Sequence, residues 1–125
     1  VRVAYCSTSV ALAILEYLVG FSDRSLVPAD LVLAAARLLD DAIEDARDNL
    51  PSDWRLSPAP ASCAAFGNRW VREERSLGLM VPSVVLPAPN VVKERNVLLN
   101  PLHPRAREIS YDRPEPIRLD ERLLA

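Results

Sequence analysis

The strongest hydrophobic pattern in this chain is residues 10–19, which read Val-Ala-Leu-Ala-Ile-Leu-Glu-Tyr-Leu-Val. On a helix these residues would point apolar side chains in every direction, so we expect a buried helix from about Thr8 to Gly20. Glu16 is the only carboxylate in this run. An unpaired charge is costly to bury, so Glu16 must find partners or a cleft. Buried carboxylates are often functional, which makes Glu16 the first candidate site residue.

The segment before this helix alternates in polarity and is rich in β-branched and aromatic residues. Residues 1–6 therefore predict a strand, which carries Tyr5. Ser7, Thr8 and Ser9 follow it as candidate N-caps for the helix. A strand that leads directly into a buried helix can bring Tyr5 close to Glu16.

Further along the chain, short apolar runs alternate with proline-containing connections. Residues 62–76 predict a surface helix whose inner side includes Phe66 and Trp70. Residues 51–60 form a proline-rich loop, with Trp54 packed over the core. Four further strands are expected at residues 77–86, 96–100, 108–112 and 116–120. A loop that contains Pro87 and Pro89 joins the first two of them, and residues 122–125 form a tail.

Residues 30–48 fit two structures. Their alanine, leucine, glutamate and arginine content favours a helix by intrinsic propensity, and nothing in the segment breaks one. The alternative is a strand at residues 31–38, followed by a helical or irregular segment at residues 41–48. Four acidic residues of this region, Asp40, Asp41, Glu44 and Asp45, lack the spacing and the glycine of a calcium loop, so we interpret them as a solvated acidic face.

Composition limits the class of protein. With 125 residues, 50% hydrophobic and 26% charged, the chain has the size and composition of one globular domain. Fifteen basic and 17 acidic residues give a net charge of −2, which offers no electrostatic case for direct nucleic-acid binding. No apolar run approaches the roughly 20 residues that span a bilayer, and the first residues lack a signal-peptide pattern. Cys6 and Cys63 read as reduced thiols of a cytoplasmic protein.

Four segments together resemble the RES family, the toxin halves of bacterial RES–Xre toxin–antitoxin pairs. Those proteins have a strand with a tyrosine, a serine-rich turn, a helix with a glutamate, a Val-Pro-Ser strand and an Asn-x-Leu-Leu-Asn-Pro block. The matching parts of this chain are Tyr5-Cys6-Ser7, residues 12–16, Val81-Pro82-Ser83 and residues 96–101. The resemblance covers nearly the whole chain, and it favours the strand at residues 31–38.

The resemblance implies an α+β fold of the ADP-ribosyltransferase-like type, with a small mixed sheet and flanking helices. It further implies cleavage of NAD⁺ between nicotinamide and ribose, with water or phosphate as the acceptor, and with NAD⁺ as substrate and no cofactor. Glu16 would stabilise the positive charge that develops on the ribose. Tyr5 would stack on the nicotinamide or the adjacent ribose, and Ser83 would hydrogen-bond the substrate, with Asn96 as a further substrate-binding candidate. The implied partner is an Xre-like antitoxin, and the family tends to form homo-oligomers.

One expected part of the site has no match. The family's active-site arginine lies about ten residues before the tyrosine matched by Tyr5, which is before the first residue of this chain. Arg2 is three positions from Tyr5 and would face the other side of the strand. We therefore expect residues 1–125 to be one RES domain that lacks the family's N-terminal portion. The alternative to an active toxin is a truncated remnant that binds antitoxin or nucleotide without turnover.

Each candidate residue also has a structural interpretation. Glu16 pairs with an arginine inside the fold in that interpretation, and Tyr5 is a half-buried strand aromatic. Ser83 is a bulge or turn residue, and Asn96, like Asn100, stabilises a turn. His103, between Leu102 and Pro104, reads as a loop or capping residue and not as a catalytic base. A binding module unrelated to NAD⁺ is expected if Tyr5, Glu16 and Ser83 do not share a cleft.

Overall fold

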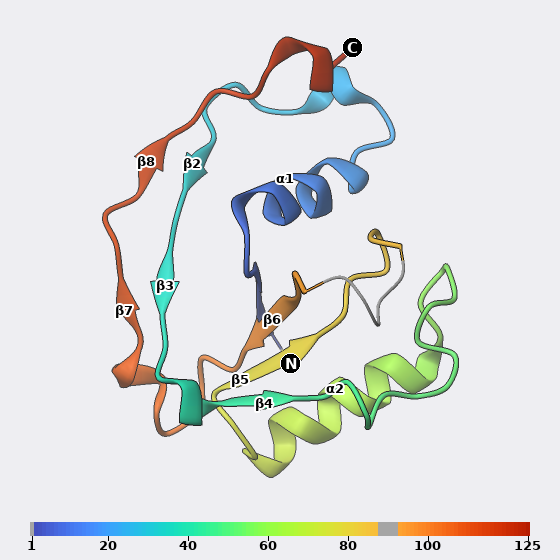
Figure 1. The fold of residues 1–125 in the computed structure, drawn as a ribbon, viewed down its shortest axis with the longest axis vertical. Coiled ribbons are helices and arrows are strands. Elements are labelled where there is room, and N and C mark those ends of the chain that lie inside the picture. Colours follow the sequence, from blue (N-terminus) through green and yellow to red (C-terminus); the bar gives the residue numbers. More distant parts are fainter. Residues whose placement is uncertain (1, 88–92) are drawn as a thin grey trace.

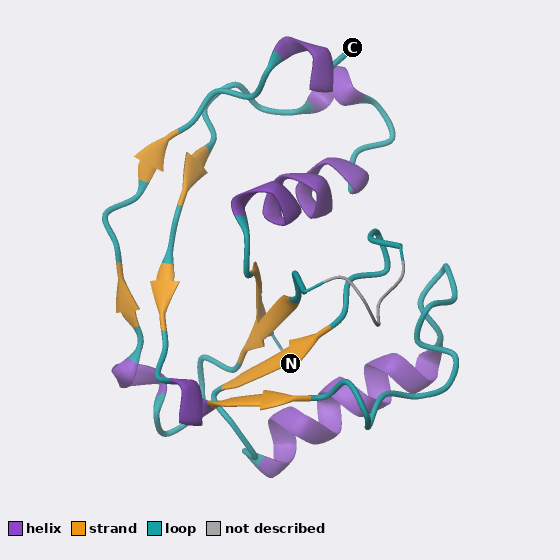
Figure 2. Cartoon of the chain, in the orientation of Figure 1, coloured by secondary structure: helices purple, strands orange, loops and turns teal. Residues whose placement is uncertain are grey.

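The computed structural model describes residues 2–87 and 93–125. Within these residues the chain forms a four-stranded mixed sheet, two α-helices and two separate pairs of short strands (Figure 1). This arrangement confirms the expected α+β class with a small mixed sheet. Helices and strands are short and long loops connect them, as the colouring in Figure 2 shows.

The central sheet has the strand order β1-β6-β5-β4. Its members are β1 (Ala4–Ser7), β6 (Asn96–Leu99), β5 (Gly78–Val81) and β4 (Ile43–Asp45). The pairs β1–β6 and β6–β5 are antiparallel, and β5–β4 is parallel. The strand expected at residues 77–86 ends early, because the next residue, Pro82, has no N–H to donate to the sheet. Of the expected connecting loop, Pro87 is described, whereas Pro89 lies outside the described residues, as does Val1 of the strand expected at residues 1–6.

The expectation of a helical or irregular segment at residues 41–48 is wrong for its central part. A single 3₁₀ turn, Asp40–Ala42, leads into β4. The Ala46 N–H then continues the pairing by donating to the Met80 carbonyl at 3.0 Å. Ala46 is fully buried. Pairing with β5 and burial of the Ala46 side chain outweigh a local helix propensity of a few tenths of a kcal/mol per residue.

The strand interpretation of residues 31–38 is confirmed. This segment contains β2 (Val32–Leu33) and β3 (Ala36–Arg37). Strand β2 pairs antiparallel with β8 (Glu115–Pro116), and β3 pairs antiparallel with β7 (Ser110–Tyr111). These strands form a long two-stranded ribbon that stands beside the central sheet in Figure 1. The strand expected at residues 108–112 is present as the shorter β7. The expectation of a strand at residues 116–120 is wrong except for Pro116, because β8 ends at that residue. A 3₁₀ turn, Glu121–Leu123, extends into the expected tail, and Arg24 donates to the Leu123 carbonyl at 2.7 Å.

Helix α2 (Ala61–Glu73) covers the sheet and completes the core. Trp70 is fully buried with Leu79 and Ala46, and its indole N–H donates to Ser76 Oγ at 2.8 Å. The helix stops short of the expected residue 76, because Glu74 takes a left-handed conformation with φ of 49°. Trp54, expected over the core, is half-buried in its loop, and the Arg55 guanidinium stacks over its ring.

Helix α1 (Val10–Val19) begins and ends where the sequence predicts. Ser9 is the N-cap and accepts a hydrogen bond from the Leu12 N–H, and Gly20 is the C-cap. The expected burial on all sides is wrong: only Leu12 and Leu18 are buried, and Val19 is 56% exposed. Because α1 packs on one side only, its outer face remains accessible. Neither this helix nor any other in the described residues is long and apolar enough to cross a membrane.

Candidate active site

Glu16 lies in the middle of α1 and receives two hydrogen bonds from distant parts of the chain. Ser83 Oγ donates to its Oε1 atom at 2.5 Å, and Asn96 Nδ2 donates to the same atom at 2.7 Å. Both partners are neutral, and none of the ion pairs among the described residues includes Glu16. The interpretation in which Glu16 pairs with an arginine is therefore wrong for this part of the chain. The half-buried carboxylate is instead stabilised by uncharged donors.

Strand register brings these residues together. Asn96 is the first residue of β6 and is paired with Ser7 at the end of β1 on one side and with Val81 at the end of β5 on the other. Ser83 follows β5 by two residues. The ends of three strands therefore meet at one edge of the sheet, beneath α1, which begins directly after β1 (Figure 1).

Asn96 links two residues of the site. Its Oδ1 atom accepts a hydrogen bond from Ser7 Oγ at 2.8 Å, while its Nδ2 atom donates to Glu16. The turn-stabilising interpretation is wrong for Asn96 and is confirmed for Asn100, whose Oδ1 accepts from the Leu102 N–H at 3.1 Å. His103 has the expected role of a loop residue, because its Nδ1 atom accepts from the Arg105 N–H at 3.0 Å within the turn.

Ser83 sits behind the carboxylate and not on the surface of the pocket. It is 3% exposed, and besides donating to Glu16 its Oγ accepts from the Val85 N–H at 3.1 Å. The hydrogen bond from the Val85 N–H confirms the turn interpretation of Ser83. The hydrogen bond to Glu16 connects that turn to the candidate site. In this structure Ser83 holds the glutamate, which is a different arrangement from the direct substrate contact that the family resemblance implies.

A pocket of about 330 Å³ opens beside Glu16. Its lining consists of Tyr5, Cys6, Ser7, Ala13, Glu16, Tyr17 and Asn96. Tyr5 is 78% exposed at its rim, so the half-buried interpretation of Tyr5 is wrong. Tyr5 and Glu16 thus share a cleft, with Ser83 hydrogen-bonded to the glutamate from behind. Tyr17 was not singled out by the sequence pattern, although its place one position after Glu16 is a local signal.

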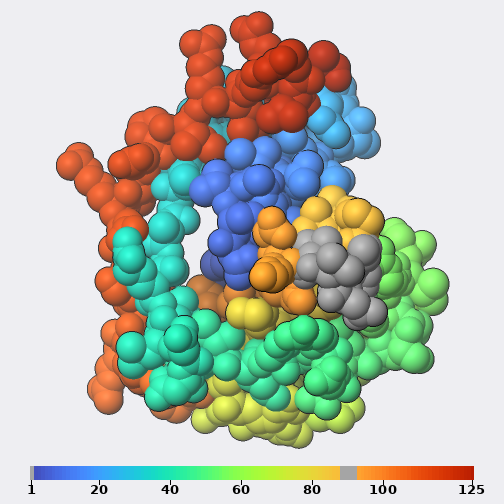
Figure 3. All heavy atoms as spheres, in the orientation of Figure 1, coloured from blue at the N-terminus to red at the C-terminus, as the bar shows by residue number. Residues whose placement is uncertain are grey.

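A larger hollow of about 610 Å³ adjoins this pocket and shares Tyr5, Cys6, Ser7 and Ala13 with it. Its remaining walls come from the start of α1, from the ribbon and from the face of the sheet that carries Met80 and Val97. Figure 3 shows the corresponding opening between the ribbon segment in cyan and the β1–α1 segment in blue. A cavity of about 720 Å³ next to α2, lined in part by Arg69 and Arg75, contains none of the candidate residues.

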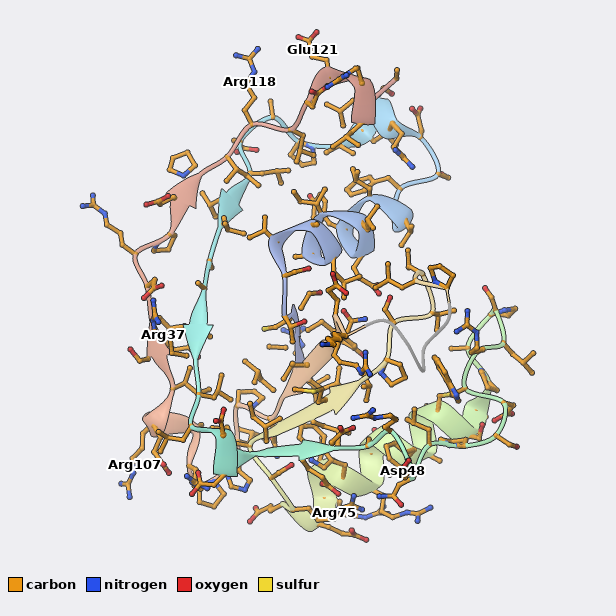
Figure 4. The ribbon with its side chains drawn as sticks, viewed as in Figure 1. Arg37, Asp48, Arg75, Arg107, Arg118 and Glu121 are labelled. Carbon is orange, nitrogen blue, oxygen red and sulfur yellow. The ribbon has the colours of Figure 1, made fainter. Side chains whose placement is uncertain are left out.

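The pocket is weakly charged. Glu16 is the one charged side chain among its described lining residues. The charged side chains labelled in Figure 4 (Arg37, Asp48, Arg75, Arg107, Arg118 and Glu121) lie at the periphery of the fold. Three acidic residues of the predicted acidic face are paired, Asp41 with Arg105, Glu44 with Arg75 and Asp45 with Arg47.

The Cys6 thiol also lines the pocket. Partial burial raises its pKa above the ordinary value for cysteine, because desolvation disfavours the thiolate. Cys6 and Cys63 are both free, so no disulfide constrains the site. The Cys6 thiol and the side chains of Tyr5 and Tyr17 therefore line the same pocket as the Glu16 carboxylate.

Comparison with known proteins places the chain in a family. The RES domain family model matches residues 1–120. The chain is 40% identical over 105 residues to a protein named Toxin Res from Yersinia enterocolitica, a match that covers 79% of this chain and 62% of that protein. It is 34% identical over 113 residues to the Prs ADP-ribosylating toxin of a Sphingobium species, covering 87% of this chain and 66% of that protein.

A third relative, named Toxin Res, comes from Photorhabdus laumondii; the match is 39% identical over 100 residues and covers 78% of this chain and 60% of the relative. The chain thus spans between three fifths and two thirds of the length of these relatives. The match to the family model extends over nearly all of the chain. The chain therefore belongs to the RES domain family, and its α+β fold is of the ADP-ribosyltransferase-like class.

Proposed function

We propose that this protein acts as a bacterial toxin that consumes NAD⁺ by cleaving the bond between nicotinamide and ribose. The observation that carries the proposal is the Glu16 carboxylate, held by two neutral donors at the wall of a pocket rimmed by Tyr5. The names of the relatives support a toxin function, since two are named Toxin Res and the relative from Sphingobium is named an ADP-ribosylating toxin.

The chemistry suits this pocket. When the bond breaks, its electron pair stays with the nicotinamide nitrogen, so the cationic ring leaves as a neutral molecule. Positive charge then builds on the ribose, as in glycoside cleavage, and a fixed carboxylate stabilises that charge. Such stabilisation is strongest where the charge is pre-positioned and water is partly excluded. Glu16 meets these conditions because it is half-buried and accepts a hydrogen bond from the buried Ser83 hydroxyl.

The dimensions of the cavities fit a dinucleotide. Small-molecule sites commonly measure about 300–1,000 Å³. The pocket beside Glu16, at about 330 Å³, would hold the nicotinamide and its ribose, and the adjoining hollow of about 610 Å³ would hold the remaining nucleotide. The exposed Tyr5 ring at the boundary of the two would stack on the nicotinamide or the ribose.

The acceptor is water or phosphate in this proposal. Water attacking the ribose carbon would lose a proton and give ADP-ribose, whereas phosphate would give a phosphorylated ADP-ribose. Transfer to a protein is a further outcome to measure, because one relative is named for ADP-ribosylating Prs. We propose an Xre-like antitoxin that covers the NAD⁺ pocket as the partner, the cytoplasm as the location, and a homo-oligomer as the assembly.

A second candidate is a scaffold that binds NAD⁺ or antitoxin without turnover. It is favoured by one observation: none of the described lining residues of the pocket is basic, so no side chain there would grip the pyrophosphate. In the family resemblance an arginine before Tyr5 has this role. The two candidates differ in turnover and not in binding.

The test is to incubate the purified protein with NAD⁺ and to quantify nicotinamide by chromatography, with and without phosphate. We expect nicotinamide release that Glu16→Ala abolishes, with mass spectrometry identifying the second product. Calorimetric NAD⁺ binding without release of nicotinamide would establish the scaffold candidate instead. Absence of both NAD⁺ binding and nicotinamide release would overturn the toxin and the NAD⁺-binding scaffold. Activity that survives Glu16→Ala would remove the role given to Glu16.

A further inference from the structure

The two hydrogen bonds to Glu16 converge on a single oxygen. Ser83 and Asn96 both donate to Oε1, at 2.5 Å and 2.7 Å. In the part of the chain that the structure describes, no hydrogen bond reaches Oε2. An ionised carboxylate has about four acceptor positions. The site therefore uses one oxygen for attachment to the fold and leaves the other for a ligand.

This division depends on which way the Asn96 amide faces. An ionised carboxylate only accepts hydrogen bonds, so the NH₂ group must face Glu16, because the amide oxygen would be repelled. The amide oxygen, Oδ1, then points the other way and needs a donor of its own. Ser7 supplies it from the end of β1 at 2.8 Å. Ser7, Asn96 and Glu16 thus form a chain in which every donation runs toward the carboxylate.

The backbone around Ser7 fixes this arrangement. Ser7 and Asn96 are direct partners in the β1–β6 register. One residue further, the Thr8 N–H donates to the Arg95 carbonyl, and the Arg95 N–H donates to Thr8 Oγ1, both at 2.9 Å. Since these bonds hold the strand ends on each other, the Ser7 hydroxyl has little freedom to leave Asn96. The N-cap of α1 is Ser9, so Ser7 is not needed to cap the helix.

We propose that Ser7 is a positioning residue of the site: its hydroxyl holds the Asn96 amide so that Glu16 is bound through Oε1 and presents Oε2 to the ribose. The inference rests on the proposed function for the identity of the ribose. Its structural content, that Ser7 sets the state of the Asn96 amide, does not depend on that function. Ser7 acts through Asn96 and contributes no chemistry of its own.

The first measurement tests the positioning directly and needs no substrate. The side-chain NH₂ protons of Asn96 are observed by ¹⁵N NMR in the wild-type protein, in Ser7→Ala and in Ser7→Thr. We expect slow solvent exchange of these protons in the wild type, faster exchange by about tenfold in Ser7→Ala, and recovery in Ser7→Thr, which keeps the hydroxyl. Unchanged exchange in Ser7→Ala, in a protein with the wild-type melting temperature, would overturn the proposal.

The second measurement is steady-state NAD⁺ cleavage. We expect Ser7→Ala to lower kcat by about tenfold with little change in KM, because the misplaced carboxylate matters most when charge develops on the ribose. Ser83→Ala, which removes a direct donor, should lower kcat further, and Ser7→Thr should restore it. Ser110→Ala on the exposed strand β7 is the matched control, with unchanged kinetics.

The two measurements separate the two proposals. If the wild type does not cleave NAD⁺, the proposed function fails, and the NMR comparison still decides the role of Ser7. If the wild type is active and Ser7→Ala is active to the same extent, the positioning role fails and the proposed function stands. Among the described lining residues, the titratable groups besides Glu16 are Tyr5 and Cys6 on β1 and Tyr17 on α1. Kinetics are therefore compared at one pH, at which Cys6 is protonated.

Discussion

Asn96 and Glu16 are 80 positions apart in the sequence, and a hydrogen bond of 2.7 Å joins their side chains. The bond connects the first residue of β6 to the middle of α1. It makes the geometry of the candidate site depend on the register of the central sheet. A site built this way tolerates little movement between helix and sheet, since the carboxylate is held from the sheet side.

Replacement of Glu16 by glutamine tests the charge without changing the shape. The amide oxygen of Glu16→Gln can still accept from Ser83 and Asn96, so the fold should be retained. It carries no negative charge, and loss of such electrostatic stabilisation costs roughly 10²–10³ in rate. We expect nicotinamide release to fall by about that factor, measured by chromatography under saturating NAD⁺.

The matched control for this variant is Glu115→Gln, at an exposed glutamate on β8. It changes net charge by the same amount at a residue outside the pocket lining. Its rate should equal that of the wild type. An equal loss in both variants would point to net charge or folding and would contradict the assignment of Glu16.

Tyr5 allows binding to be separated from stability. Because the side chain is 78% exposed, its removal should leave the melting temperature unchanged. Stacking requires the ring and not the hydroxyl, so Tyr5→Phe should keep the wild-type KM for NAD⁺ and Tyr5→Ala should raise it about tenfold. Leu102→Ala, at a residue that is 77% exposed and outside the pocket, serves as control. A loss of activity in Tyr5→Phe would show that the hydroxyl, and not the ring, is required.

The core depends on Trp70, which is fully buried and donates to Ser76 Oγ. Truncation of a buried tryptophan to alanine costs about 3–5 kcal/mol. Domains of this size are commonly stable by only about 5–15 kcal/mol, so Trp70→Ala should be largely unfolded or strongly destabilised. Urea titration followed by circular dichroism measures the effect.

Trp54→Ala is the comparison for Trp70, because Trp54 is only half-buried. It should lower the free energy of unfolding by less than half as much. A larger loss from Trp54 than from Trp70 would contradict the position of the core. Both variants keep Glu16 and its donors, so any loss of activity should follow the fraction of folded protein.

Acid should destabilise the fold through paired carboxylates. The hydrogen bond from the Arg47 side chain lowers the pKa of Asp45, and that from Arg105 lowers the pKa of Glu108. A carboxyl with a lower pKa in the folded state binds fewer protons there than in the unfolded chain, so its contribution is complete above the unfolded pKa of about 4. It is lost as the pH falls through the lower, folded value.

We therefore expect the urea midpoint to be flat near neutral pH and to fall below about pH 5. Asp45→Asn should reduce the pH dependence, because the group that titrates is gone. Ser52→Ala, at an exposed residue without a carboxyl, should leave the pH dependence unchanged. A midpoint that rises on acidification would contradict the direction of these shifts.

Cys6 reports on occupation of the pocket. Because burial raises the pKa of its thiol, the reactive thiolate is scarce at neutral pH. Alkylation of Cys6 in a Cys63→Ser background should be slower than that of free cysteine and should accelerate as the pH rises. NAD⁺ should slow it further, since Cys6 lines the same pocket as Glu16. Alkylation as fast as that of free cysteine, measured by mass spectrometry, would contradict the burial.

Local chemistry determined much of the framework. Ser9 and Gly20 delimit α1 as the sequence predicts, because capping depends on residues within one helical turn. The helix around Trp70 and the strand before Ser7 follow from periodicity within about ten residues. The resemblance of four short segments to the RES family pointed to Tyr5, Glu16, Ser83 and Asn96, and the match of the family model over residues 1–120 confirms the family.

The tertiary structure alone decided how these pieces meet. Strand β4 forms against a local helix preference, because pairing with β5 exists only in the folded sheet. The one-sided burial of α1 depends on what packs beside it. The joint donation of Ser83 and Asn96 to one oxygen of Glu16, and the link from Ser7, span 67 to 89 positions and follow from strand register. The sequence by itself therefore determined which residues to consider, and long-range pairing decided their roles, because hydrogen-bond geometry between distant segments is set by the sheet and not by neighbours in the chain.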